Sequence, residues 1–181
     1  VSNNILSNLK KMLTYDCKIV QIFVDINLNY DPIKLFINQN NMYIVVHSSY
    51  SINLAKNWNE HSWWIVQFLL EIKKSIEIGC YAIVVHFGKQ LELSIEESLN
   101  NMLSSLTYIC SQINNTKLLI LLETSSGQGT ELCYKLEELA YFYNKIPINI
   151  KHRFGICLDT CHVFVAGHNI KKINYFNDFH K

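Results

Sequence analysis

Five short apolar runs recur along the chain, and a helical pattern follows each of the first four. The runs are 19–26 (IVQIFVDI), 42–47 (MYIVVH), 81–87 (YAIVVHF), 117–123 (KLLILLE) and 154–159 (FGICLD). Their apolar character is nearly continuous, which is typical of strands buried on both faces of a parallel sheet. The pattern therefore predicts about five parallel strands that alternate with helices.

The helical stretches between these runs carry their own start and stop signals. An opening helix is expected at about 2–14. Asp31 is predicted to cap the next helix with Pro32 at its first position, and Ser94 and Glu97 have the spacing of a capping box. Apolar residues trace one face of three later helices: Trp64, Phe68, Leu69, Ile72 and Ile76, ended by Gly79; Leu99, Met102, Leu103, Leu106, Ile109 and Ile113; and Leu132, Leu136, Leu139 and Tyr143, before Pro147.

This alternation defines an α/β protein, either a barrel or a doubly wound sheet. A dinucleotide-binding sheet would carry a glycine-rich loop after its first strand. The chain instead has its only glycine pair, Gly127 and Gly129, after the fourth run. The pattern therefore favours a barrel, built by a single domain over residues 1–181.

Composition narrows the class of protein without fixing its function. The 181 residues are 49% hydrophobic and 17% charged, as expected for a folded domain, and the net charge of +1 comes without a basic arm. Six scattered cysteines without a CxxC pair, and no visible signal peptide, predict free thiols in an intracellular protein. The apolar runs are too short to cross a bilayer, so no membrane association is expected.

Polar residues stand where four consecutive runs end. His47, His86, Glu123 and Asp159 follow one another at nearly equal steps along the chain, and His162 comes three residues after Asp159. Because the carboxyl ends of barrel strands converge on one mouth, these side chains are expected to meet there. Two imidazoles and two carboxylates form a ligand set suited to Zn²⁺ or Mn²⁺.

Other interpretations of these histidines stay open at this point. A single histidine at a strand end is often a hydrogen-bonded structural residue, although four strands in register make chance less plausible. His162 is either a further ligand or a polar residue at the start of a helix. His61, His152 and His168 are expected to be surface or cap residues.

Three segments resemble the endonuclease IV family, the second family of apurinic/apyrimidinic endonucleases. GICLDTCH at 155–162 matches its central signature at every position, and HSSYSINLA at 47–55 matches another except at Ser51, where the family carries a larger apolar residue. ETSSGQGT at 123–130 is similar to the glutamate-containing loop of the family. Phe87 is a second departure, because the family usually has proline there.

The resemblance implies a (β/α)₈ TIM barrel with a trinuclear zinc cluster at its mouth. It implies that His47 and His86 hold the first Zn²⁺, that the catalytic Glu123 bridges the first and second, that Asp159 binds the second and that His162 binds the third. The implied reaction is DNA repair by hydrolysis of the phosphodiester 5′ to an abasic site. The implied partner is double-stranded DNA with abasic sites, bound by a monomer.

Tyr50 matches a position of the family that touches DNA near the lesion. Enzymes that take a nucleotide out of the stack meet the least resistance where the base is already missing, which suits an abasic substrate. The alternative for Tyr50 is a half-buried aromatic side chain that packs on the adjacent loop.

The extent of the chain leaves the implied cluster incomplete. A barrel of this kind has about 250 residues, and the predicted strands correspond to its central portion. The second and third zinc ions would lack ligands, because the later segments that carry them in the family do not occur in this sequence. His180 has no matching context and is not expected to be a ligand. The chain is thus expected to be either a fragment or a degenerate homologue. The alternative functions are a divalent-metal sugar isomerase or epimerase, and a non-catalytic zinc- or DNA-binding remnant.

Overall fold

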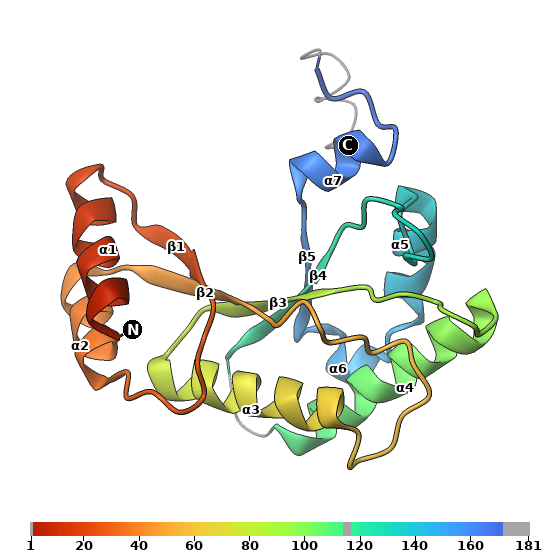
Figure 1. Cartoon of the computed structure of the whole chain (residues 1–181), viewed down its shortest axis with the longest axis horizontal. Helices are drawn as coiled ribbons and strands as arrows, with labels where there is room; N and C mark the ends of the chain where they lie inside the picture. The colour runs from red at the N-terminus through yellow and green to blue at the C-terminus, as the bar shows by residue number, and fades with distance from the viewer. Residues whose placement is uncertain (1, 114–116, 172–181) are drawn as a thin grey trace.

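The computed structural model describes residues 2–113 and 117–171, in which strands and helices alternate from the first strand to the last (Figure 1). The elements follow in the order α1 (Ser2–Thr14), β1 (Ile19–Ile22), α2 (Asp31–Asn40), β2 (Tyr43–His47), α3 (Trp63–Ile78), β3 (Ala82–His86), α4 (Ile95–Gln112), β4 (Leu119–Glu123), α5 (Leu136–Lys145), α6 (Ile148–Lys151), β5 (Phe154–Cys157) and α7 (Thr160–Val165).

All five strands form one parallel sheet in which spatial order equals chain order, β1-β2-β3-β4-β5. A doubly wound sheet reverses its strand order at a switch point, whereas a βα barrel adds each strand beside the preceding one. The sequential order therefore confirms the predicted barrel-type α/β fold. Within the described residues the sheet stays open, with β1 and β5 as its edges.

The two faces of the sheet differ in burial. Side chains that point toward the helices, among them Ile44, Val46 and Ile120, are completely buried in the main core. Their neighbours on the opposite face, such as Val45 and Leu121, are only partly buried. In Figure 1, α3, α4 and α6 lie along one side of the sheet. The opposite face corresponds to the interior of a barrel and is incompletely covered by the described residues.

The predicted strands are longer than the observed ones, most clearly for the first. The run 19–26 predicts eight residues, but β1 ends at Ile22. Ile22 is the last residue of β1 in register with β2, opposite Val46. Beyond it the backbone leaves the sheet, and the Asp25 amide donates a hydrogen bond to the Tyr30 hydroxyl. The apolar pattern of 19–26 could not reveal this departure of the backbone from the sheet.

Most helix signals are confirmed, with two corrections. The helix at 2–14 forms as predicted, Ser94 and Glu97 make the capping box, and Gly79 ends α3 in a left-handed conformation. Asp31 is the first residue of α2 and not its N-cap. The N-cap is Tyr30, whose side chain makes no capping hydrogen bond. Leu132 precedes α5 and packs in the core from the loop.

The stripe predicted for α3 is partly wrong, because Ile76 is exposed whereas Glu71 is buried. Among the described residues, no helix is both long and apolar enough to cross a membrane.

Candidate metal centre

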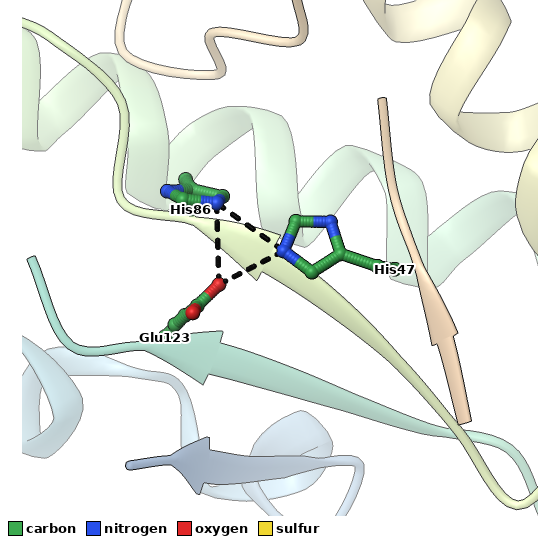
Figure 2. Close-up of side chains that lie close together, drawn as sticks. All are labelled: His47, His86 and Glu123. Carbon is green, nitrogen blue, oxygen red and sulfur yellow. Dashed lines mark hydrogen bonds and ion pairs between the residues drawn. The ribbon is translucent and has the colours of Figure 1, made fainter. Parts of the chain in front are cut away.

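Three of the predicted ligands are the last residues of adjacent strands. His47 ends β2, His86 ends β3 and Glu123 ends β4, and their side chains converge in Figure 2. His47 Nε2 lies 3.1 Å from Glu123 Oε2, His86 Nε2 lies 3.2 Å from the same oxygen, and the two Nε2 atoms are 3.3 Å apart. The parallel register thus places three potential ligand atoms in a nearly equilateral triangle.

The size of this triangle fits tetrahedral zinc. Nitrogen and oxygen ligands lie about 2.0–2.1 Å from zinc, so two ligand atoms of one tetrahedron are separated by about 3.3 Å. The three measured separations, 3.1, 3.2 and 3.3 Å, agree with this value. These three residues also form one of two groups of metal-ligand residues in the described chain.

The hydrogen bonds of His47 decide which of its ring atoms is available. Its Nδ1 lies 2.7 Å from the carbonyl oxygen of Ser48. A carbonyl can only accept, so Nδ1 carries the proton, and Nε2 of the neutral ring presents its lone pair to Glu123. A lone pair that faces a carboxylate requires a proton or a metal ion between them. The backbone carbonyl of the next residue, Ser48, therefore orients His47 so that Nε2 is available as a ligand atom.

The pKa values of the imidazoles reflect these surroundings. Burial alone would lower the pKa of His47, but its hydrogen bonds to Glu123 and Ser48 outweigh burial and raise it. Burial lowers the pKa of His86, and the nearby rings of His47 and His162 add to this effect against the attraction of Glu123. His86 thus favours the neutral form, the form that binds a metal.

Asp159 and His162 join the same cluster from the start of α7. Glu123, Asp159 and His162 form the second group of metal-ligand residues in the described chain. His162 Nδ1 lies 3.6 Å from Glu123 Oε1 and 3.8 Å from Asp159 Oδ2. Glu123 therefore belongs to both groups, with Oε2 toward the two histidines of the first group and Oε1 toward His162.

Local structure fixes both residues of this second group. Asp159 caps α7, and its Oδ1 accepts the amide hydrogens of Cys161 and His162. Burial alone would raise the pKa of Asp159, but these amides and the nearby imidazole lower it, so the carboxylate stays ionised. His162 Nδ1 donates to the Thr124 carbonyl at 2.8 Å, which leaves its Nε2 available. His162 is thus both a residue of the first turn of a helix and a potential ligand.

Tyr50 lies against this cluster and is largely exposed to solvent. Its ring centroid is 4.9 Å from that of His47 and 5.5 Å from that of His86, with Phe23 at 5.4 Å. With 72% of the residue exposed, Tyr50 is not half-buried as the alternative expected, although its ring does contact Phe23. An open cleft of about 460 Å³ begins at Tyr50 and His86 and extends to Lys56 and Lys89.

The other histidines that the structure describes lie apart from the cluster. His61 is exposed and pairs with its neighbour Glu60, and His152 is the C-cap of α6, as predicted. His168 is partly buried just after α7. His180 lies outside the described residues. The two positions that depart from the family differ in burial: Phe87 is buried against Phe142, whereas Ser51 is exposed.

Two residues of the site escaped prediction from the sequence. Thr124 accepts the Asp159 amide hydrogen on Oγ1 and the His162 Nδ1 hydrogen on its carbonyl oxygen. Glu71 is a buried carboxylate on α3 that accepts the amide hydrogen of Ser49, two residues after His47. A carboxylate one helical turn from Phe68, on an otherwise apolar face, was the signal that could have revealed it.

Comparisons with known proteins agree with this architecture. The profile of the family described as "Xylose isomerase-like TIM barrel" matches residues 14–180. A protein named "Probable endonuclease 4" from Mycoplasma capricolum is 37% identical over 137 residues, which cover 75% of this chain and 46% of that relative. The resemblance to the endonuclease IV family is thereby confirmed. The chain spans about half the length of the curated relatives that it matches.

Solved structures show the same fold. The crystal structure of endonuclease IV from Thermus thermophilus superposes with a TM-score of 0.69 at 18% identity, over 94% of this chain and 64% of that one. A D-tagatose 3-epimerase-like protein gives a TM-score of 0.73 at 20% identity, over 93% of this chain and 66% of that one. At these identities the likeness concerns the barrel fold alone.

Proposed function

Since the chain belongs to the xylose isomerase-like TIM barrel family, we propose that the protein is a zinc-dependent endonuclease that hydrolyses the phosphodiester 5′ to abasic sites in double-stranded DNA. One observation carries the proposal. Each of the three segments that resemble endonuclease IV contributes side chains to the same cluster: His47 from the first, Glu123 from the second, and Asp159 with His162 from the third. A curated relative named for an endonuclease supports the same assignment.

The donor set of the cluster suits the proposed metal. His47, His86 and Glu123 would hold one Zn²⁺, and Glu123 would share a second with Asp159. His162 would turn Nε2 toward a third, because Nδ1 is engaged by Thr124. Bound zinc would act as a Lewis acid on the phosphoryl oxygens and lower the pKa of a bound water to about 7.

The protein side chains would hold these ions and the substrate in place. Glu123 Oε2 lies 3.2 Å from His86 Nε2, and Glu123 Oε1 lies 3.6 Å from His162 Nδ1. This one carboxylate would therefore fix the spacing of two ions. Tyr50 would stack on a nucleoside near the lesion, beside the cluster. Lys56 and Lys89 in the adjacent cleft would bind backbone phosphates. We further propose an intracellular monomer whose six cysteines stay reduced.

Substitution of the shared carboxylate tests the assignment. Glu123→Gln is expected to lower the zinc content and to reduce nicking of an abasic-site duplex at least about 100-fold, because metal assistance contributes several kcal/mol. Zinc is measured by elemental analysis and nicking by gel electrophoresis. Glu137→Gln, an exposed substitution in α5, is the matched control and should change neither. Unchanged zinc and nicking in Glu123→Gln would refute the metal assignment.

The nicking assay, together with an assay for sugar conversion, separates the proposed function from its two alternatives. A sugar isomerase or epimerase would convert ketoses or aldoses and leave the abasic duplex intact. A non-catalytic remnant would nick nothing even with excess zinc. The shared barrel fold does not distinguish these possibilities, whereas turnover of the two substrate classes does.

A further inference from the structure

Glu71 is a buried carboxylate that forms no ion pair with any residue of the described chain. Only 3% of the residue is exposed, in the middle of α3. Its Oε1 accepts from Gln67 Nε2 at 2.8 Å, and its Oε2 accepts from the Ser49 amide at 3.1 Å. Within residues 2–113 and 117–171, no lysine, arginine or histidine forms an ion pair with it. Because burial of a carboxylate is costly, its presence in α3 calls for a role.

The amide that Glu71 accepts belongs to the peptide unit between Ser48 and Ser49. The carbonyl of that unit is Ser48 C=O, which accepts the Nδ1 hydrogen of His47 at 2.7 Å. In a trans peptide the N–H and the C=O point in opposite directions. This single peptide therefore connects the Glu71 carboxylate on one side to the His47 imidazole on the other.

Hydrogen bonds in such a chain polarise one another. When a carboxylate accepts the amide hydrogen, the peptide unit is polarised and its carbonyl oxygen becomes more negative. That oxygen is then a stronger hydrogen-bond acceptor. The stronger acceptor keeps the imidazole proton on Nδ1 and holds the Nε2 lone pair toward Glu123 and His86. Metal-binding histidines commonly receive this support directly from a carboxylate or a carbonyl, and here both would act in series.

The remaining contacts of the loop hold this peptide in one orientation. The Ser48 amide donates to the Val84 carbonyl in β3, and the Ile52 amide donates to the Ser49 carbonyl. Tyr50 follows directly and lies over the His47 ring. A rotation of the Ser48–Ser49 peptide would thus move both the His47 acceptor and the start of the Tyr50 segment.

We propose that Glu71 is a positioning residue, which acts through the Ser48–Ser49 peptide to fix the tautomer and orientation of His47 and to strengthen metal binding by it. The role in metal binding rests on the proposed function, whereas the effect on the tautomer does not. An apolar side chain of similar size at 71 would leave the partly buried Ser49 amide without the acceptor that it has in Glu71.

Two substitutions in the full chain test this role. Glu71→Ala removes the acceptor, and Glu71→Gln keeps an oxygen for the Ser49 amide but removes the charge. Glu77→Gln, on the exposed side of the same helix, is the control. Nitrogen-15 NMR of the metal-free chain reports the His47 tautomer, competition with a chelator gives the zinc affinity, and thermal unfolding reports stability.

The role predicts a graded result. Zinc affinity is expected to fall about 10–100-fold in Glu71→Ala, as for other outer-shell partners, and by less in Glu71→Gln. The Nδ1–H signal of His47 should weaken in parallel, while Glu77→Gln matches the original chain. A purely structural role would lower the unfolding temperature and leave the tautomer and zinc affinity of the folded protein unchanged.

Each other outcome has a definite meaning. If Glu71→Ala folds with an unchanged tautomer and zinc affinity, the role of Glu71 is refuted and the proposed function stands. If Glu71→Ala does not fold, Glu71→Gln decides, and original values in that variant refute the role. If the unsubstituted chain binds no zinc, the proposed function fails, and the NMR measurement still decides the effect on the tautomer.

Discussion

At the scale of single residues, the carboxylate of Glu123 determines whether the cluster can act as one site. Its Oε2 serves the group with His47 and His86, whereas its Oε1 faces His162. Loss of Asp159 would leave the first group intact, and loss of His47 would leave the second. Only a change at Glu123 affects both, so this residue connects the two halves of the centre.

Tyr50 offers a prediction about substrate binding that is independent of stability. Tyr50→Ala is expected to raise KM for an abasic duplex about 5–100-fold, because stacking of a base on an aromatic ring contributes about 1–3 kcal/mol. Since the side chain is mostly exposed, the free energy of unfolding should change by less than about 0.5 kcal/mol. Tyr50→Phe retains the ring and serves as the control. An unchanged KM in Tyr50→Ala would exclude a role in binding DNA.

The residues of the site were predictable to different degrees. His47, His86 and Glu123 were found because each ends an apolar run and parallel register brings strand ends together. The roles of Thr124 and Glu71 depend on partners from other elements, Asp159 and Ser49, that lie far away in the sequence. The position of Glu71 on an apolar face was a signal in the sequence, but its partner, and that of Thr124, are known only from the folded chain.

At the scale of elements, the loop after β2 is joined to the loop after β3 through Asn53. Its Nδ2 donates to the Lys89 carbonyl, and its Oδ1 accepts from the amides of Lys89 and Ala55. Gly88 makes this arrangement possible: its φ is +85°, and a Cβ atom there would clash with Asn53 Oδ1. A single glycine thus keeps two loops beside the site in contact.

Gly88→Ala is accordingly expected to destabilise the protein by more than the strain of the left-handed backbone alone, which costs about 1–2 kcal/mol. Gly79→Ala is the matched control, because Gly79 has nearly the same φ of +86° with no atom near the added methyl group. Urea unfolding measures both. Equal destabilisation of the two variants would show that the clash with Asn53 is relieved at no cost.

Glu131 accepts hydrogen bonds from the loop that follows β4, and we expect this arrangement to make stability depend on pH. Burial alone would raise its pKa, but hydrogen bonds from Ser126 and the Gln128 amide, with the charge of Lys89, lower it. A group whose pKa is lower in the folded state stabilises that state above its unfolded pKa, and this contribution is lost as the pH falls through the folded pKa.

The test is a comparison of Glu131→Gln with the original chain across this range. At neutral pH the variant should be less stable by about 1.5–3 kcal/mol, the usual contribution of a hydrogen bond to a charged group. Below the folded pKa both side chains are neutral, so the difference in unfolding free energy should vanish. Glu137→Gln, an exposed neighbour, controls for the loss of charge. A difference that persists unchanged in acid would contradict this explanation.

The bounds of the helices and strands were predictable where neighbouring residues in the sequence determine them. They were not predictable where contacts with distant elements determine them. The capping box of Ser94 and Glu97 and the glycine end of α3 form as expected, since each is satisfied within a few residues. β1 ends at Ile22, beyond which the Asp25 amide donates a hydrogen bond to the Tyr30 hydroxyl. Leu132 lies before α5, where its amide donates a hydrogen bond to the Gly88 carbonyl. Sequence periodicity contains neither fact.

At the scale of the whole molecule, the described residues bury the face of the sheet that packs on the helices, and they leave the opposite face partly exposed. Ile83 and Val85 of β3 are fully buried, and β3 has a paired strand on both edges. Every residue of β1 is at least partly exposed, and β1 pairs only with β2 among the described strands. Among the strands that the structure describes, β5 pairs with β4 alone, and its Ile156 is exposed. Stability should therefore decrease from the middle of the sheet toward both edges.

Amide hydrogen exchange in the chain of 181 residues measures this gradient directly. Hydrogen-bonded amides of β3 and β4 are expected to exchange only through global unfolding, whereas those of β1 and β5 open locally and exchange at least about 10-fold faster. The central strands are the internal reference for the edges. If all five strands showed equal protection, the sheet would open as one cooperative unit, and the exposed edges would not weaken it.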